Sequence, residues 1–244
     1  MNPGKHLDFL LQQWPFDPDC ACVRLVKGCD GRDVIQLRLD LGILQLETQG
    51  RPDGVKPEGF TTMLDLLLHE EEQNPDFDLT EETCVEIDRE FVQYYQRRVA
   101  WLRLQHFERA MQDADHTLAL MDFCRDHSPD EQWTVRHEQH RGFVIFHRTQ
   151  AAALAAIEAE SAEDAVAQVN DGLELIRESF ADMGWEDQFD GDELVQRLYQ
   201  LRDSLCDEYA IGKSLRERLA EAVATEQYEL AARLRDELTR RSEN

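Results

Sequence analysis

The hydrophobic period of this chain changes once and divides it into a strand-rich beginning and a helical remainder. From Cys22 to Thr48 apolar and polar residues alternate, which is typical of half-buried strands. Residues 22–27, 34–40 and 43–48 carry this alternation and are separated by turns that contain glycine. From Thr80 onward apolar residues recur every three or four positions, which predicts helices only.

The first 78 residues are predicted to form a small α+β domain. A short helix over residues 5–13 precedes three antiparallel strands, and the alternation slips by one residue at Gly42, where we expect a bulge or bend. A sheet of this size is not stable unless another element covers it. The apolar face of the helix predicted over residues 62–73 is the expected cover.

Residues 79–182 are predicted to form a body of antiparallel helical hairpins. Thr80 is suited to cap the first helix, and the periodicity breaks at Gln105-His106. Large residues of the first helix would pack over small ones of the second, in the register Tyr94, Trp101, Phe107, Ala110, Ala114 and Leu118. A weaker echo of the same pattern runs from Arg148 to Ile176. This register resembles the tetratricopeptide helix-turn-helix, although a plain helical bundle accounts for the same pattern. Residues 183–212 are predicted to be a linker and one more helix, so the fold class is α+β and mostly α.

The charge of the chain is not evenly distributed. The whole sequence has 26 Lys plus Arg and 51 Asp plus Glu, a formal net charge of -25 at pH 7. Residues 213–244 contain seven basic and seven acidic residues, so the whole excess lies in residues 1–212. A shift of this kind marks a module boundary.

The neutral segment is predicted to be a hairpin of two short helices. Ser214 can cap the first, and a break near residues 225–227 leads to a second helix in which leucines recur every four residues. The pair Ala231-Ala232 would allow the helices to approach closely, and Arg235-Asp236 beside the apolar seam would fix their orientation. Two helices of this length are marginal alone in water, so they gain stability by packing on another surface.

The run Tyr-Glu-x-Ala-Ala-x-Leu-Arg-Asp-Glu-Leu at residues 228–238, with the leucines before it, resembles the UVR motif. That helical hairpin occurs in the repair proteins UvrB and UvrC, in Clp-type chaperone ATPases and in the McsA adaptor. Gln227 stands where the family usually has Asp. The resemblance implies protein-protein contact, including pairing between two such hairpins, and no catalysis by the hairpin itself. It assigns the protein-binding role to Leu215, Leu219, Ala222, Tyr228, Glu229, Ala231, Ala232, Leu234, Arg235, Asp236 and Leu238.

The composition argues against several classes of function. The net charge of -25 disfavours direct binding to the phosphate backbone of nucleic acids. The sequence lacks an apolar run of 18 residues, and its N-terminus is unlike a signal peptide, so we expect a cytoplasmic protein that does not span a membrane. Phosphate-binding loops, the nucleophile elbow and the dinucleotide fingerprint are also missing, and no cofactor is expected.

Two groups of residues offer an alternative, a metal-dependent enzyme or a zinc-binding protein. Cys20, Cys22 and Cys29 provide three thiols near the first strands, although structural zinc sites favour pairs separated by two to four residues. His137, His140 and His147 are predicted to lie near one helical face, where neighbouring arginines make a basic patch.

The leading hypothesis is a non-catalytic, bacterial-type adaptor. Its helical body would hold a client or partner, and its hairpin would dock another UVR-bearing protein of DNA repair or protein quality control, or pair with itself in a homodimer.

Overall fold

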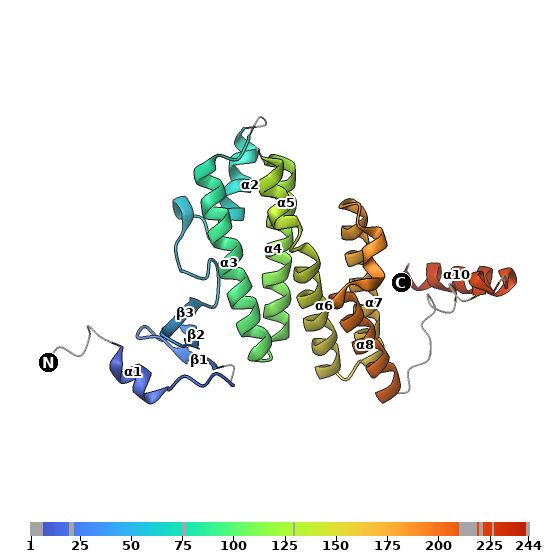
Figure 1. Cartoon of the computed structure of the whole chain (residues 1–244), viewed down its shortest axis with the longest axis horizontal. Helices are drawn as coiled ribbons and strands as arrows, with labels where there is room; N and C mark the ends of the chain where they lie inside the picture. Colours follow the sequence, from blue (N-terminus) through green and yellow to red (C-terminus); the bar gives the residue numbers. More distant parts are fainter. Residues whose placement is uncertain are drawn as a thin grey trace.

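The computed structural model describes residues 7–19, 22–74, 77–128, 130–209, 219, 222–225 and 227–242, with side chains through residue 236. Most of this chain is helical, with one small sheet near its N-terminal end (Figure 1), as the fold class predicted. In chain order the elements are α1 (Asp8–Gln13), β1 (Val23–Lys27), β2 (Asp33–Leu39), β3 (Gly42–Glu47), η1 (Pro57–Gly59), α2 (Met63–Gln73), α3 (Glu81–Arg103), α4 (Phe107–His127), α5 (Glu131–Glu138), α6 (Arg141–Glu158), α7 (Ala162–Asp182), η2 (Glu186–Gly191), α8 (Glu193–Glu208) and α10 (Tyr228–Ser242).

The three predicted strands form an antiparallel sheet in the order β1-β2-β3. Ile35 pairs with Leu46 and Leu37 pairs with Leu44, so the alternation places a row of apolar side chains on the covered face. Leu39 lies opposite Gly42, which leaves two residues for the turn between β2 and β3. The bulge or bend predicted at Gly42 is therefore wrong, because a two-residue hairpin turn produces the same slip in the alternation.

The sheet packs on the α3–α4 hairpin. Ile35 and Leu46 share a buried cluster with Trp101 and Phe107, which lie where α3 ends and α4 begins. The prediction that residues 62–73 cover the sheet is therefore wrong. The connection over residues 48–62 carries α2 toward the opposite end of the hairpin, where α2 packs among α3, α4 and α5 (Figure 1). Periodicity predicted the apolar face of α2 correctly. Which helices this face packs against is decided by the long connection over residues 48–62.

Two antiparallel helical hairpins, α3–α4 and α6–α7, make up the body. Gln105 and Glu160 have φ angles of 60° and 59°, and each lies in the turn of one hairpin. The predicted cap is confirmed, since the side chain of Thr80 accepts a hydrogen bond from the backbone N–H of Thr83. The short helix α5 stands between the two hairpins in the chain and buries Trp133. The tetratricopeptide interpretation of these hairpins stays a prediction.

The last helix of the body, α8, packs on the α6–α7 hairpin. Phe189, in the segment predicted to be a linker, is buried in the same cluster as Val169 of α7 and Val195 of α8. Residues 186–191 therefore form a packed 3-10 turn between two helices of one core. The domain boundaries predicted at residues 78, 182 and 212 stay predictions. None of the described helices is both long and apolar enough to traverse a bilayer.

Candidate functional site

The C-terminal segment has a small apolar cluster of its own. Ala222, Ala231 and Leu234 are buried together, and Leu219 packs against them. The backbone N–H of Gln227 donates to the carbonyl oxygen of Ala222 at 2.7 Å, which closes the turn between residues 222–224 and α10. Residues before and after this turn thus fold onto each other as the predicted hairpin requires.

Apolar side chains also lie on the outside of this segment. Tyr228 is 68% exposed, Val223 is 54% exposed and Leu230 is 39% exposed. Large exposed apolar side chains are common singly, but three within eight residues of a short hairpin form a candidate contact surface. Arg235 and Asp236 pair at 2.9 Å and are both exposed on α10.

The predicted docking residues divide into two groups in the structure. The seam unites Leu219, Ala222, Ala231 and Leu234, whereas the following residues are exposed: Tyr228, Glu229, Ala232, Arg235 and Asp236. Ala232 is therefore outside the close contact in which it was predicted, because successive helical residues point about 100° apart and Ala231 already occupies the seam. Leu215 lies outside the described residues, as does the side chain of Leu238.

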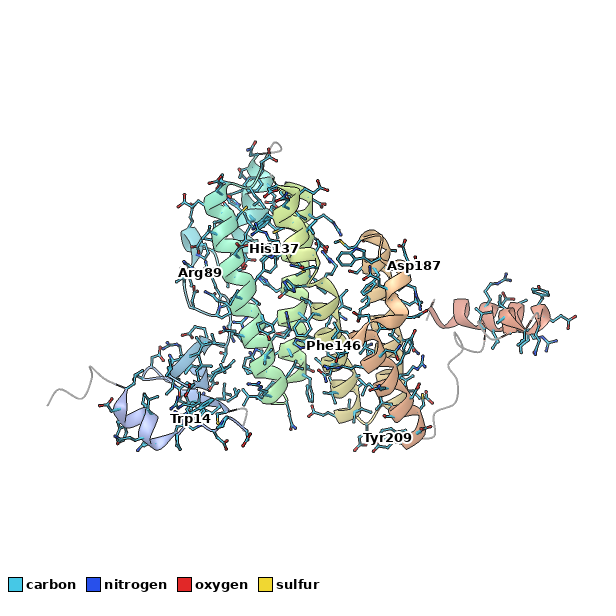
Figure 2. All side chains as sticks on the ribbon, in the orientation of Figure 1. Trp14, Arg89, His137, Phe146, Asp187 and Tyr209 are labelled. Carbon is cyan, nitrogen blue, oxygen red and sulfur yellow. The ribbon has the colours of Figure 1, made fainter. Side chains whose placement is uncertain are left out.

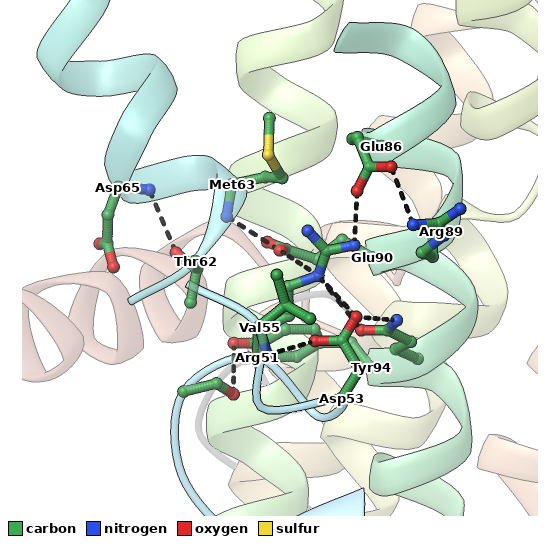
Figure 3. Close-up of polar contacts among 12 residues, drawn as sticks. Arg51, Asp53, Val55, Thr62, Met63, Asp65, Glu86, Arg89, Glu90 and Tyr94 are labelled. Carbon is green, nitrogen blue, oxygen red and sulfur yellow. Dashed lines mark hydrogen bonds and ion pairs between the residues drawn. The ribbon is translucent and has the colours of Figure 1, made fainter. Parts of the chain in front are cut away.

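A network of polar side chains lies at one side of α3 and holds the connection between β3 and α2. The buried side chain of Arg51 pairs with Glu86 at 2.8 Å and with Asp53 at 3.3 Å (Figure 3). Glu90, fully buried, accepts from the backbone N–H of Met63 at 2.8 Å, at the start of α2. These contacts attach residues 51–63 to α3, which is how α2 reaches its position.

The same network continues toward α4. The ring nitrogen Nε2 of His116 lies 2.8 Å from Glu90, and its ring stacks on Tyr94 at 3.8 Å between centroids. Arg97 donates to both carboxylate oxygens of Asp113, from Nε at 2.9 Å and from Nη2 at 2.7 Å. Burial raises the pKa of Tyr94, so its hydroxyl stays protonated and donates to the carbonyl oxygen of Gly50. Through these hydrogen bonds the network holds the β3–α2 connection, α3 and α4 together.

The three histidines of the metal hypothesis do not converge. His137 is the penultimate residue of α5 and His140 precedes α6, so the single helical face predicted for them is interrupted between residues 138 and 141. His137 lies beside α3 (Figure 2), and its Nε2 is 2.8 Å from Asp88 of that helix. His147 Nδ1 instead accepts a hydrogen bond from Arg98. Burial lowers the pKa of both histidines, and that of His147 falls to about 4.

The thiols give no metal site in the part of the chain that the structure describes. Cys22 is half-buried and Cys29 is exposed, while Cys20 lies outside the described residues. No group of three or more His, Cys, Asp or Glu side chains in the described ranges is arranged to hold a metal ion. Cys84 and Cys124 belong to the core, where burial raises the pKa of each thiol.

Sequence reasoning did not identify the buried charges of α3. Glu90, Arg97 and Arg98 are all buried, although charged side chains are usually exposed. Their spacing was an available signal, because they follow Ile87 by three, ten and eleven residues and so share its helical face.

A family model described as UvrB/uvrC motif matches residues 213–241. This match covers the segment that contains the Ala222–Ala231–Leu234 seam and leaves residues 1–212 without an assignment. Comparison with curated proteins and with solved structures gives no significant match.

Proposed function

We propose that this chain is a non-catalytic adaptor of the bacterial cytoplasm whose C-terminal hairpin docks a partner protein. The observation that carries the proposal is the UvrB/uvrC motif at residues 213–241, in a segment that leaves Val223, Tyr228 and Leu230 exposed. Proteins that contain this motif belong to DNA repair and to protein quality control, and either setting suits an adaptor. The helical body would hold a client or second partner.

The size of the hairpin core supports a docking role. Its described seam buries two alanines and one leucine, which is a small apolar area for an independent unit. At about 25 cal/mol per Å² of apolar surface, such a seam contributes only a few kcal/mol against the entropy of ordering two helices. A second apolar surface over Tyr228 and Leu230 would stabilise the hairpin further, and a UVR-type hairpin of another protein or of a second copy offers one.

The charge distribution favours the tail as the contact region. The balanced charges of residues 213–244 allow a partner of either sign to approach, whereas residues 1–212 carry the whole net charge of -25. Direct contact with nucleic acid is not part of the proposal, because an acidic chain repels phosphate.

Affinity purification with the full chain tests this function when it is compared with the chain ended after Gly212. We expect the partner to bind the full chain and to be lost with residues 213–244. The body should still bind any client of its own. Partners that all survive the truncation would contradict the docking assignment.

Two alanine substitutions sharpen the same experiment. Ala231 is 8% exposed and lies in the seam, whereas Ala224 of the same hairpin is exposed and is not among the predicted docking residues. Ala231→Glu should weaken the hairpin by about 2–4 kcal/mol, because an unpaired charge would be buried, and partner binding should fall at least tenfold. Ala224→Glu adds the same charge at the surface and should bind within about threefold of the wild type. Equal effects of the two variants would contradict the seam.

Sedimentation of the purified chain distinguishes self-pairing from binding to another protein.

A further inference from the structure

A pocket of about 540 Å³ opens into the helical body between α3, α4, α5 and α6. Apolar side chains make up much of its wall, among them Phe91, Tyr95, Met121 and Phe143. Its volume falls in the range of about 300–1,000 Å³ that small-molecule sites occupy. None of the described residues of the C-terminal hairpin lines this pocket, so the site is argued independently of the docking proposed above.

A buried guanidinium lines this pocket. Arg98 is 1% exposed, and its Nε and Nη1 donate to His147 Nδ1 at 3.3 Å and to Thr117 Oγ1 at 3.1 Å. Neither acceptor is a carboxylate, and His147 is neutral near pH 7 because burial and the neighbouring Arg98 lower its pKa. Within the described residues, Nη2 of Arg98 donates to no protein acceptor, and no buried side-chain nitrogen or oxygen lacks a partner, so Nη2 is open to the pocket and is the donor left for a ligand.

The nearby carboxylates are already engaged. Asp113 accepts two hydrogen bonds from the adjacent Arg97. Asp88, the acidic residue among those that line the pocket, accepts from Trp133 Nε1 at 2.9 Å and from His137 at 2.8 Å. Arg98 therefore keeps its positive charge inside the protein without an ion-pair partner in the described chain, an arrangement that costs free energy unless an anion arrives.

More basic groups stand among the lining residues. Arg136 and His140 lie on the pocket wall together with His137. In a chain with a net charge of -25, the pocket thus gathers two guanidinium groups, those of Arg98 and Arg136, around an apolar space. A guanidinium binds a carboxylate through two parallel hydrogen bonds, and exclusion of water strengthens such a pair.

We propose that this pocket binds a small amphipathic carboxylate, with the acid group paired to Arg98 and an aromatic or branched apolar body packed among Phe91, Tyr95 and Phe143. One buried guanidinium matches a monoanion. The apolar wall distinguishes such a ligand from inorganic anions, which have nothing to pack there.

The probes 3-phenylpropionate, its uncharged amide and inorganic phosphate test this site on the full chain. Binding is followed by chemical-shift changes of the ¹⁵N-labelled protein. We expect the acid to bind with a Kd of about 1 mM or tighter, given its few heavy atoms, and the amide at least tenfold more weakly. Acid and amide that bind equally, or phosphate that binds while the acid does not, would overturn the proposal. So would the failure of all three to bind.

Substitutions locate the site. Arg98→Met keeps an unbranched stem and removes the charge, so affinity for the acid should fall at least tenfold while affinity for the amide changes little. Arg89→Met is the matched control, because Arg89 lies on the same helix, is 56% exposed and is not part of the pocket wall. Acid binding that Arg98→Met leaves intact would contradict the role of Arg98.

A second variant covers the case in which Arg98→Met does not fold. Val92 lines the pocket and is 56% exposed, so a larger side chain fits there without entering the core. Val92→Trp should fill the opening and weaken binding of the acid and the amide together, at least fivefold. Wild-type affinity for the acid in Val92→Trp would place the ligand elsewhere and overturn the proposal.

Discussion

Three charged residues of α3 lie inside the protein, and each is stabilised in a different way. Glu90 accepts from His116 and from the start of α2, and Arg97 pairs with Asp113. Arg98 has only neutral acceptors, one of them the ring of His147. At the scale of the residue, the partners therefore decide whether a buried charge connects two elements or stands ready for a ligand.

His147 makes the stability of the body depend on pH. Burial and the neighbouring Arg98 lower its pKa to about 4, below the ordinary value near 6.5. Between these two pH values His147 is protonated in the unfolded chain but stays neutral in the folded chain. Its contribution to the stability of the folded state is therefore complete above about pH 6.5 and is lost as the pH falls toward 4. From this group alone, we expect the free energy of unfolding to fall by about 2 kcal/mol between pH 7 and pH 5.

His147→Gln removes this contribution, since a neutral amide can accept from Arg98 without titrating. Urea unfolding at pH 7 and pH 5 measures the free energy for both proteins, and the wild type is the control because it shares every other titrating group. The loss between the two pH values should be smaller by about 2 kcal/mol in the variant. Equal losses in the two proteins would show that His147 titrates normally.

The elements were predicted well where the signal is local. The alternation of β1–β3, the cap at Thr80 and the break at Gln105 are all set by neighbouring residues, and the structure confirms them. The position of α2 was predicted wrongly. It depends on the contacts of Arg51, which lies outside the segment whose apolar pattern predicted α2. The apolar seam of the hairpin could be predicted down to Ala231, while Arg98 needed contacts from α4 and α6 that no local pattern contains.

The α6–α7 hairpin provides a test of close packing. Gly172 of α7 faces the side chain of Thr149 on α6, and a Cβ added to Gly172 would overlap that side chain. Gly172→Ala should therefore lower the free energy of unfolding by about 1–3 kcal/mol, because the two helices must separate or shift.

Gly142→Ala is the matched control on α6. Its added Cβ would make only an ordinary contact, 3.9 Å from the ring of Phe180. Replacing a helical glycine there should raise the free energy of unfolding by about 0.5–1 kcal/mol, since alanine loses less backbone entropy. Opposite signs for the two variants in urea unfolding support the close approach of α6 and α7, and a stabilising effect of Gly172→Ala would contradict it.

At the scale of the whole molecule, charge and packing divide the chain near the same place. The net charge of -25 belongs to residues 1–212, and the apolar cluster of the described tail contains only Leu219, Ala222, Ala231 and Leu234. The cores of the body contain helices α2–α8 and the sheet. The described tail residues therefore form an apolar cluster that is separate from the clusters of the body.

This division predicts that the body does not need the hairpin for its stability. The chain ended after Gly212 should unfold at the same urea concentration as the full chain, with a free energy of unfolding within about 0.5 kcal/mol, because distant sites with no shared contacts contribute independently. Far-ultraviolet circular dichroism should show a smaller helical signal for the shorter chain, by the contribution of α10 and its partner segment. A drop of more than about 1 kcal/mol would show instead that the hairpin packs on the body, and its exposed Tyr228 and Leu230 would then be covered within the chain rather than offered to a partner.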